Sequence, residues 1–533
     1  MTRYARLFVG AISLAGLSVA HAQIYKVTLS GANEIPAVVT NGTGSAVISL
    51  NAITHEMHVV AGFSGLVGTS TASHVHCCVV QPANAGVATT SPTFVGTPLG
   101  VTSGSWDRVY DMSQAGTWNA PFLTASGNTA AGAEAAFITG VAAGQSYLNV
   151  HSSFAPGGEV RGFLVPNRFA ANSALSAGGR NLAGALDAIG AGTGAMNTAL
   201  VALAGLSSAP QAAALERLSP AASRGLQTVV SESLDTAFDR VADRLGGLRA
   251  GGDAGSFAQA ATGLWLMGNG VDSSQGSRDG YAGYKNSGWG AALGVDHGVA
   301  EGRYVGASLN YSHSSLTYRD QSDGDTAHVR STHLALFASQ DVGATGFVEA
   351  QVAYGMQRYE NTRNTGATGV AAGDFDGKTW AARVGGGMRL GMSSATSFTP
   401  QLRVDWLSVQ HDPYAETGGG PFALFVDKTR AERVRASLGG QLDFGGTASV
   451  SPYVRAFYHH AFSNAGLDAS TGFTPTGTRF GTPGQELERE NYTAGAGVNF
   501  HSGNSFAAAI TYDGTFSGSY HSHVYEAKLR WTF

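Results

Sequence analysis

The second half of the chain alternates between apolar and polar positions over long stretches. From about residue 261 to residue 533 we count about twelve segments of nine or more residues with this pattern, separated by clusters of Gly, Asn, Asp or Ser. Alternation with a period of two places apolar side chains on one face of a strand and polar side chains on the other. Because an even number of strands near twelve can close without free edges, the pattern predicts a β-barrel over residues 255–533. The alternation is clearest within residues 303–311, 332–339, 347–354, 401–409, 452–458 and 506–512, which are parts of these segments.

The last strand of this barrel carries the clearest alternation. Its apolar face consists of Tyr525, Ala527, Leu529, Trp531 and Phe533. The residues between them are charged or polar, so one face suits lipid and the other suits a water-filled lumen. We therefore expect a transmembrane barrel.

Aromatic and charged residues in the barrel segment predict two further features. Aromatic residues near strand ends are expected to form the interfacial girdles of a membrane barrel. They include Trp265, Tyr304, Tyr311, Tyr359, Trp406, Tyr453 and Tyr512. Arginines alternate with acidic residues, which is more typical of solvated charge ladders in a lumen than of a catalytic site. They are Arg303, Arg358, Arg383, Arg389, Arg403, Arg433, Arg435 and Arg455, with Glu349, Asp405, Glu432 and Asp443.

A segment rich in Ala and Leu precedes the barrel, at residues 167–254. It has almost no aromatic residues, and this composition favours helix and flexible linker over sheet. Apolar residues recur within it at spacings of three and four, which predicts a helix over residues 221–249, after Ser219-Pro220 and before Gly251-Gly252. They are Leu226, Val230, Leu234, Phe238, Val241, Leu245 and Leu248. The other faces of this helix carry Glu232, Asp235, Asp239, Arg240, Asp243 and Arg244.

Short alternating runs broken by Gly, Asn and Pro predict a β-sandwich over residues 23–166. The expected strands are residues 25–29, 44–50, 56–63, 136–138, 146–151 and 159–165. A segment of this length is enough for one core. The predicted fold is therefore all-β: an N-terminal β-sandwich, a helical linker, and a C-terminal twelve-stranded transmembrane β-barrel with a helix in its lumen.

The first residues are typical of a secretory signal peptide. Arg3 and Arg6 precede an apolar run over residues 7–20, and Ala20-His21-Ala22 supplies small residues for cleavage. We therefore expect residues 1–22 to be removed. Since no later stretch of about 18 residues is continuously apolar, we expect the chain to cross a membrane as strands and not as a helix.

Composition fits an exported β protein. The 74 glycines and 13% charged residues suit a chain with many turns. A formal net charge of -5 gives no reason to expect nucleic acid as a partner.

The 2 cysteines, Cys77 and Cys78, are adjacent and cannot connect distant parts of one chain. In an oxidising compartment they could form a disulfide with each other, ligate a soft metal beside His76, or pair between chains. Adjacent cysteines also avoid a large disulfide loop in a chain that crosses a narrow pore. We favour this structural role over a metal role.

Three histidines of the N-terminal segment form a candidate metal site. His74 and His76 lie two apart on one face of a strand, and His151 lies at the end of another strand. Three converging imidazoles suit Cu or Zn. The alternative, which we take as the default, is that these side chains hydrogen-bond turn backbone or carboxylates such as Glu159. We expect no required cofactor.

Motifs of common enzymes are missing from the sequence. His55-Glu56-Met57-His58 is one residue short of the zinc-protease spacing and lies in a segment typical of a strand. No G-x-S-x-G turn and no Walker loop is present. Apart from the candidate metal site, we expect a passenger without enzymatic activity.

The order of signal segment, small β module, helical segment and barrel ending in Trp531-Thr532-Phe533 resembles the autotransporter family of type V secretion. Residues 212–220 (AAALERLSP) are similar to that family's lead into the helix that threads the barrel, and the resemblance covers about residues 210–533. It implies an outer-membrane pore that delivers its own passenger outward. It also implies export by the Sec translocon and insertion by machinery that recognises the final strand, whose apolar face begins at Tyr525.

Two properties of autotransporters bear on the passenger. Some members cut their own linker with an acidic residue and an Asn, but this segment has no Asn between Thr198 and Asn269, so we do not expect that cleavage. Autotransporter esterases carry their nucleophile in an early Gly-Asp-Ser motif, and nothing after Gln23 matches it.

Residues 24–165 resemble a CHRD domain, named for its occurrence in chordin. Four pieces carry the resemblance: residues 29–36 (LSGANEIP), 73–76 (SHVH), 147–151 (YLNVH) and 156–162 (PGGEVRG). The chain departs from the family after His76, where Gly-Pro-Ala is expected and Cys77-Cys78 stands instead. The family supplies no settled activity.

The sequence thus predicts a bacterial outer-membrane autotransporter that displays its passenger at the cell surface as a binding or structural module. Its expected partners are outer-membrane lipids, the export and insertion machinery, and an extracellular ligand that the sequence does not identify. One alternative is a copper- or zinc-binding, redox-type passenger that uses His74, His76 and His151. Another is a porin-like channel whose N-terminal domain stays in the periplasm.

Overall fold

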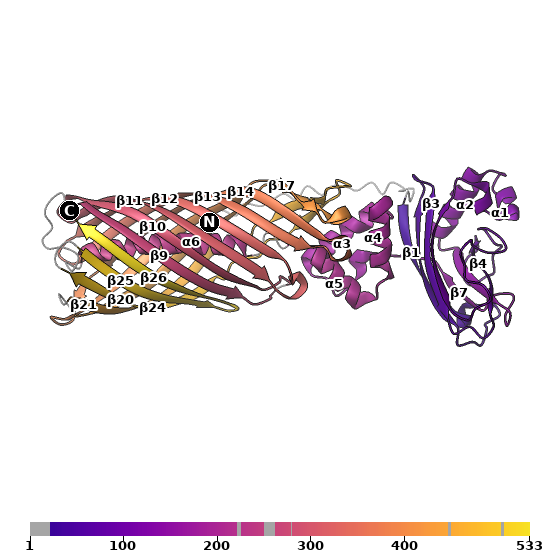
Figure 1. Cartoon of the computed structure of the whole chain (residues 1–533), viewed down its shortest axis with the longest axis horizontal. Helices are drawn as coiled ribbons and strands as arrows, with labels where there is room; N and C mark the ends of the chain where they lie inside the picture. The colour runs from indigo at the N-terminus through magenta and orange to yellow at the C-terminus, as the bar shows by residue number, and fades with distance from the viewer. Residues whose placement is uncertain are drawn as a thin grey trace, which may run out of the picture. The chain divides into compact units, whose positions relative to one another are not determined.

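The computed structural model describes residues 22–220, 225–249, 262–278, 280–445, 449–502 and 506–532 (Figure 1). The chain divides into two compact units. The first comprises the residues up to Phe169 with Leu186–Ser207, and the second comprises Ala170–Ala185 with the residues from Ser208 onward. Of the expected signal peptide, residues 1–21 lie outside the described residues, as does Phe533.

The first unit contains one antiparallel sheet of eight strands. Along the sheet the strands follow the order β4, β6, β7, β1, β2, β3 and β5, with β8 beside β1. They are β1 (Ala22–Ser30), β2 (Thr43–Asn51), β3 (Glu56–Ser64), β4 (Ser70–Cys77), β5 (Gly104–Asp111), β6 (Ser146–Ser152), β7 (Val160–Phe163) and β8 (Val165–Pro166). Strand β5 is not among the predicted strands, and β4 is expected only through the placement of His74 and His76 on one face of a strand.

The core of this unit is shared by two halves of the same sheet. Ile48 and Met57 from one half belong to the same buried cluster as Val75 and Leu148 from the other. The halves are joined where Ser30 of β1 pairs with a residue of β7. The expected sandwich is thus a single sheet that curls around its core.

Residues 136–138 form part of a helix and not the predicted strand. Helix α2 spans Ala130–Ala142, after the short α1 (Ala120–Ala125). The side chain of Thr129 caps α2 by accepting a hydrogen bond from the backbone N–H of Gly132 at 3.1 Å. Three apolar residues in a row fit a strand or a buried helix turn equally well, and the surrounding alanines decide for helix.

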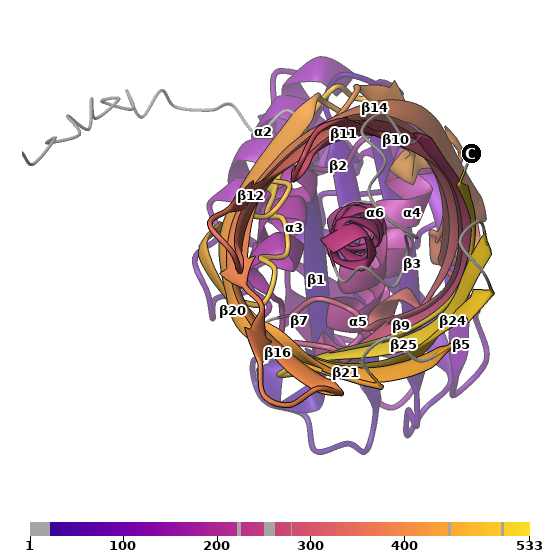
Figure 2. The ribbon, with the colours of Figure 1, turned by 90° about the vertical axis from the view of Figure 1, so that its left-hand side faces the viewer.

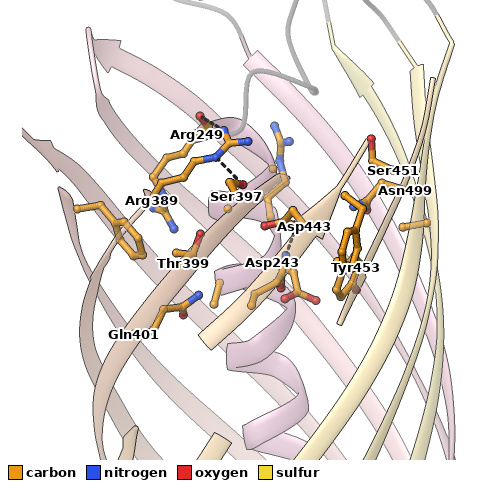
Figure 3. Close-up of a pocket in the computed structure, with 18 of the residues that line it drawn as sticks. Asp243, Arg249, Arg389, Ser397, Thr399, Gln401, Asp443, Ser451, Tyr453 and Asn499 are labelled. Carbon is orange, nitrogen blue, oxygen red and sulfur yellow. Dashed lines mark hydrogen bonds between the residues drawn. The ribbon is translucent and has the colours of Figure 1, made fainter. Parts of the chain in front are cut away.

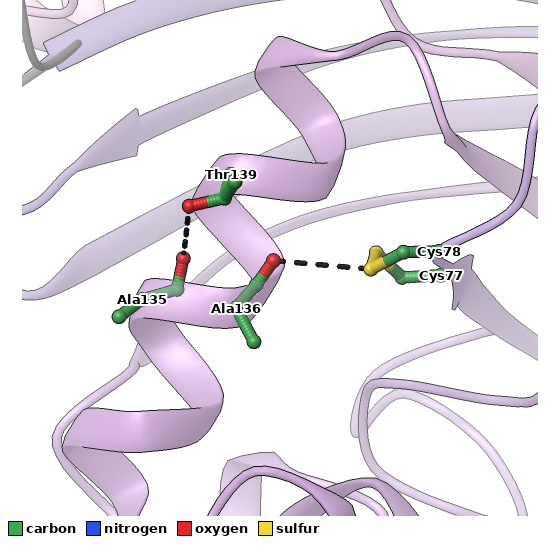
Figure 4. Close-up of a disulfide and its surroundings, with 5 residues drawn as sticks. All are labelled: Cys77, Cys78, Ala135, Ala136 and Thr139. Atoms are coloured by element: carbon green, nitrogen blue, oxygen red, sulfur yellow. Dashed lines mark hydrogen bonds between the residues drawn. A yellow bond between two sulfur atoms is a disulfide. The ribbon is translucent and has the colours of Figure 1, made fainter.

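Helix α2 packs directly against the disulfide between Cys77 and Cys78 (Figure 4). The carbonyl oxygen of Ala136 lies 3.8 Å from the sulfur of Cys78. A Cβ atom at Gly140 would overlap both cysteine sulfurs, so a glycine is needed for this close approach. The structure therefore joins the two cysteines to each other, one of the arrangements considered from the sequence.

The described part of the Ala- and Leu-rich segment contains four α-helices where the sequence predicts one. They are α3 (Ala177–Ile189), α4 (Gly194–Gly205), α5 (Ser208–Leu218) and α6 (Leu226–Arg249). In the first unit, Asn197 of α4 donates to the Ser49 hydroxyl of β2 at 2.8 Å, so this part of the expected linker packs on the sheet. In the second unit, α5 is held by Arg363, which donates to the carbonyl of Leu218 at 2.9 Å.

Twelve long antiparallel strands form a closed barrel within the described part of the second unit. They are β9 (Thr262–Gln275), β10 (Tyr284–Ala300), β11 (Arg303–Tyr318), β12 (Thr326–Val342), β13 (Gly346–Asn364), β14 (Val370–Met388), β16 (Thr396–His411), β20 (Thr429–Phe444), β21 (Val450–Asn464), β24 (Glu490–Ser502), β25 (Phe506–Ser517) and β26 (Tyr520–Thr532). Closure comes from the pairing of β26 with β9 and of β14 with β16. The predicted barrel is confirmed.

Short strands accompany the barrel. β15 (Leu390–Gly391) and β18 (Thr417–Gly418) extend its sheet. A separate sheet follows the order β17 (Tyr414–Ala415), β19 (Leu424–Val426), β22 (Ala469–Phe473) and β23 (Arg479–Thr482). Among the described residues no helix is long and apolar enough to cross a membrane.

The outer surface of the barrel is apolar along its strands. Leu334, Leu336, Val352 and Val384 are each more than half exposed. In β26, Tyr525, Ala527, Leu529 and Trp531 face outward, whereas Glu526, Lys528 and Arg530 are buried toward the lumen. This is the division that the alternation in the last strand predicts.

Four of the aromatic residues assigned to the girdles point into the barrel instead. Trp265, Tyr304, Tyr359 and Tyr453 are all buried, with exposed fractions of 5% or less. Trp265 and Tyr304 pack on Val241 and Leu245 of α6, because part of the lumen is itself apolar. Aromatic residues that do face outward include Trp289, Trp380, Trp406, Tyr492 and Tyr525.

We predict that Gly140→Ala destabilises the first unit by about 1–3 kcal/mol, because the new methyl group overlaps the sulfurs of Cys77 and Cys78. The sign is diagnostic, since alanine inside a helix is normally better than glycine by about 1 kcal/mol. Pulse proteolysis of the full chain in urea measures the effect. Gly116→Ala is the control, because a Cβ there meets nothing within 4 Å. Equal stability of the two variants would contradict the packing described here.

We also predict that unfolded protein made without reductant contains no reactive thiol and that reductant releases two, one each from Cys77 and Cys78. Thiol titration in denaturant measures this. A monomer band on a non-reducing gel then excludes pairing between chains. Two free thiols before reduction would show that the bond does not form.

Candidate functional site

Helix α6 runs inside the barrel, surrounded by its strands (Figure 2). The predicted helix extended over residues 221–249; residues 221–224 lie outside the described part, and α6 begins at Leu226 and ends at Arg249. All seven residues of its predicted apolar stripe are buried. They pack on the part of the wall formed by β9 to β14 and β16, for example on Tyr284 and Tyr359.

The face of α6 that carries the aspartates meets a wall rich in basic residues. Asp235, Asp239 and Asp243 lie four residues apart and therefore share one face of the helix. Each contacts at least two basic side chains of the barrel strands, and Asp235 also lies 3.9 Å from Arg383. The pairs are Asp235 with Arg433 and Arg435 (3.1 and 2.8 Å), Asp239 with Arg383 and Arg403 (2.6 and 2.9 Å), and Asp243 with Arg455 (2.5 Å) and Lys528. One helix face is thus neutralised by the barrel wall.

Two arginines of α6 form ion pairs in the opposite sense. Arg240 donates to Glu526 of β26 at 2.9 Å. Arg244 makes two hydrogen bonds of 2.7 Å to Asp296 of β10, and all four side chains are buried. Breaking a buried pair of this kind costs about 3–5 kcal/mol, because a charge is left without its partner. The helix is therefore fixed in the lumen by charges of both signs.

Part of the lumen remains as cavities beside α6. A cavity of about 560 Å³ lies around its last turns, where Asp243 and Arg249 face polar residues of the strands (Figure 3). Those strands contribute Ser397, Thr399, Gln401, Asp443, Ser451, Tyr453 and Asn499. A second cavity of about 140 Å³ borders Asp235 and Asp239. Both are lined by hydrogen-bonding groups, as expected of a wet lumen.

Some charged residues of the predicted ladder lie outside the lumen. Arg358 and Glu432 are exposed and pair with Asp374 and Arg430 at 2.6 Å each. Arg303 is also exposed. The predicted ladder is real for Arg383, Arg403 and their neighbours, but alternation alone does not show which charges face inward.

His74, His76 and His151 lie together in the first unit. Antiparallel pairing of β4 with β6 places Tyr147 opposite His76 and Ala72 opposite His151. The ligand atoms that the three rings offer all lie within 4.8 Å of one another. His74 and His76 are buried, and His151 is half-buried. The structure therefore brings together the three residues that the sequence nominates.

Each ring of this cluster contacts a backbone carbonyl through its Nδ1 atom. The carbonyls belong to Pro92 for His74 (3.2 Å), Ala85 for His76 (2.8 Å) and Pro156 for His151 (2.9 Å). Part of the default reading therefore holds, because the histidines do contact turn backbone. Glu159 instead accepts hydrogen bonds from the Thr40 hydroxyl and from the backbone N–H of Val67 at 2.7 Å.

Burial keeps the cluster neutral at ordinary pH. It lowers the pKa of His74 to about 3, helped by the neighbouring His151 and His76. It also lowers the pKa of His76 to about 4 and lowers the pKa of His151. Neutral imidazole is the form that binds metals.

Tyr147 and Arg161 support the cluster and were not singled out from the sequence as site residues. Tyr147 stacks on His76 with ring centroids 4.6 Å apart, and Arg161 lies 4.6 Å from the tyrosine ring. Arg161 also donates to the Asn84 side chain at 2.6 Å and to the Pro82 carbonyl at 2.8 Å. Asn84 directly precedes Ala85, whose carbonyl contacts His76. Both residues belong to sequence pieces that carry the CHRD resemblance, and this was the available signal.

The two other histidines in the first half of the unit stand apart from this cluster. His55 contacts Glu134 at 2.8 Å, and His58 contacts Asp107 at 2.6 Å. His58 lies in a strand, and the two histidines contact carboxylates from different elements. His55 and His58 therefore do not form the helical zinc-protease arrangement.

Family models match both units. The autotransporter β-domain model matches residues 264–513, and the CHRD domain model matches residues 25–164. These are the two families that the sequence resembles. The CHRD match covers nearly the predicted residues 24–165, and the β-domain match covers the barrel part of the predicted residues 210–533.

Two relatives are similar to the chain, and one of them is named as an outer membrane protein. Outer membrane protein B of Rickettsia japonica (strain ATCC VR-1363 / YH) is 22% identical over 339 residues, which is 57% of this chain and 20% of that protein. Lipase 1 of Photorhabdus luminescens is 22% identical over 238 residues, or 42% of this chain and 35% of that protein. This chain thus spans about a fifth of the length of the outer membrane protein and about a third of the lipase.

Among solved structures, the translocator domain of autotransporter NalP from Neisseria meningitidis matches with a TM-score of 0.46 and 17% identity, covering 57% of this chain and 98% of that one. The two family matches, the closed barrel and the outer-membrane relatives lead to one conclusion. The chain carries a CHRD domain at residues 25–164 and an autotransporter β-domain at residues 264–513, and its barrel belongs in the bacterial outer membrane.

Proposed function

We propose that the barrel holds this chain in the outer membrane and displays the CHRD domain at the cell surface as a binding or structural module. The observation that carries the proposal is the ionic contact between α6 and the barrel wall, above all Asp239 with Arg383 and Arg403. A helix held by charges of both signs keeps the preceding part of the chain tethered to the barrel.

Retention of the passenger follows from the same helix. The sequence has no Asn between Thr198 and Asn269, and an Asn on the helix is the residue that self-cleaving relatives of this family pair with an acidic group. Residues 250–261 are outside the described part, but they too contain no Asn. We therefore propose that passenger and barrel remain one chain.

An open channel is the less supported alternative. The lumen of a twelve-stranded barrel lies between small barrels that side chains fill and large porins that conduct. Here α6 occupies it, and the cavity around its last turns measures about 560 Å³. We propose that the barrel is plugged by its own helix after assembly.

An esterase passenger is also disfavoured. One relative carries the name Lipase 1. No G-x-S-x-G turn, and no Gly-Asp-Ser after Gln23, supplies a nucleophile in this sequence.

We propose that the Sec translocon exports the chain and that the barrel-insertion machinery then recognises the final strand. The outward face of that strand carries Tyr525, Leu529 and Trp531, which contact lipid after insertion.

We predict that proteinase K added to intact cells removes the CHRD domain and leaves the barrel in the membrane. Immunoblots with antibodies against each part measure this. Before protease, outer membranes should contain a single full-length band, because passenger and barrel stay joined. A periplasmic enzyme serves as the control for envelope integrity. Survival of the CHRD domain until the outer membrane is permeabilised would instead support the periplasmic alternative.

We further predict that replacing Asp235, Asp239 and Asp243 together by Ala raises the conductance of the barrel in planar bilayers several-fold. The substitutions remove the carboxylates of the helix that pair with the wall, while Arg383 and Arg435 keep Asp405 as a partner. The helix thus loses these charged contacts and leaves the lumen more often. Asp374→Ala is the matched control, because Asp374 pairs with Arg358 on the exposed surface. Wild-type conductance in the triple variant would contradict the role given to these ion pairs.

A further inference from the structure

The three-histidine cluster of the CHRD domain has a feature that hydrogen bonding within the protein does not explain. The feature concerns the Nε2 atoms of His74, His76 and His151. The inference drawn from it does not depend on display at the cell surface, because every residue involved lies in the first unit.

The backbone fixes the tautomer of all three rings. A carbonyl oxygen can only accept a hydrogen bond, so a ring nitrogen beside it must carry the proton. The Nδ1 atoms of His74, His76 and His151 each lie 2.8 to 3.2 Å from such an oxygen. In a neutral imidazole the other nitrogen, Nε2, then carries a lone pair and no proton.

The three rings offer ligand atoms that all lie within 4.8 Å of one another. The Nε2 atoms of His74 and His151 lie 2.9 Å apart, and two lone pairs at this distance repel unless a cation lies between or beside them. The Nε2 atom of His76 is buried, and no described residue gives it a hydrogen-bond partner. Leaving such a buried acceptor unsatisfied costs about 1–3 kcal/mol.

We propose that His74, His76 and His151 bind one divalent transition-metal ion through their Nε2 atoms. Nitrogen ligands of this kind suit Cu²⁺ and Zn²⁺, and Cu²⁺ binds such sites more tightly at equal concentration. The Nδ1 contacts to the carbonyls of Pro92, Ala85 and Pro156 are the outer hydrogen bonds that orient histidine ligands in metal sites.

The site has a coordination position that the protein does not fill. Within the described residues, the group able to hold a metal consists of the three histidines. Structural zinc sites usually have four protein ligands, whereas sites that bind an external ligand have three and keep the fourth position open. Since His151 is the half-buried member, solvent or a small external ligand reaches the ion from its side.

Neighbouring side chains position the His76 ring and the loop beside it. Arg161 donates to Asn84 and to the Pro82 carbonyl, and so positions the segment whose Ala85 carbonyl contacts His76. Tyr147 stacks on the same ring at 4.6 Å. These contacts hold the His76 ring in place before an ion arrives, which reduces the cost of ordering the ligand on binding.

The experiment measures metal binding by the untagged full chain in detergent. The protein is stripped with a chelator, equilibrated with Cu²⁺ or Zn²⁺, freed of unbound ion and assayed by mass spectrometry for metal. Wild type should retain one equivalent that His74→Gln and His151→Gln each lose, with affinity reduced about a hundredfold or more. The Cu²⁺ form should show nitrogen couplings from its ligands in its electron paramagnetic resonance spectrum.

Controls separate this site from the other histidines of the chain. His55→Gln is the matched variant in the same unit, because His55 contacts Glu134 and lies outside the cluster. The His55→Gln variant should retain one equivalent of metal, as wild type does. Pulse proteolysis without metal checks that each variant is folded. If His74→Gln does not fold, His151→Gln alone tests the proposal. Equal metal content in wild type and both cluster variants, or no retained metal in folded wild type, would overturn the proposal.

Discussion

Closure of the backbone hydrogen bonds is the constraint on which the second unit depends. In lipid an unpaired N–H or C=O group has no water to bind, so each costs several kcal/mol. Pairing of β26 with β9 and of β14 with β16 removes both edges of the sheet. Once twelve strands close, however, they enclose a lumen too wide for wall side chains alone to fill, and α6 occupies it.

The helix and the wall are complementary because both are divided in the same way. Leu226, Phe238 and Leu245 face an aromatic and aliphatic part of the wall, whereas Asp235, Asp239 and Asp243 face its arginines. Rotating the helix about its axis would place carboxylates against Tyr359 and leucines against Arg383. The ion pairs therefore fix the orientation of the helix, and the apolar contacts supply most of its burial.

The same division explains how far the sequence predicts the structure. Period two identifies the barrel strands, and spacings of three and four identify α6, because one face of each element is uniformly apolar. Trp265 and Tyr359 were placed on the wrong face because the lumen is apolar where α6 presents leucine and valine, so alternation is lost there. The strand predicted at residues 136–138 was wrong for a different reason, because three apolar residues are too few to show a period. The flanking alanines and the packing on Cys77 and Cys78 make this segment part of helix α2.

The histidine cluster shows what sequence reasoning finds at a site and what it misses. The i, i+2 spacing of His74 and His76 gives two side chains on one face, and the pairing of β4 with β6 adds a third. The carbonyls of Ala85, Pro92 and Pro156 could not be predicted, since they come from irregular loops whose path depends on contacts such as those of Arg161. Because His74 and His151 come from separate strands, the site exists only in the folded domain. A chain that crosses the outer membrane unfolded would complete this site only after export, so metal binding would favour the folded state on the far side.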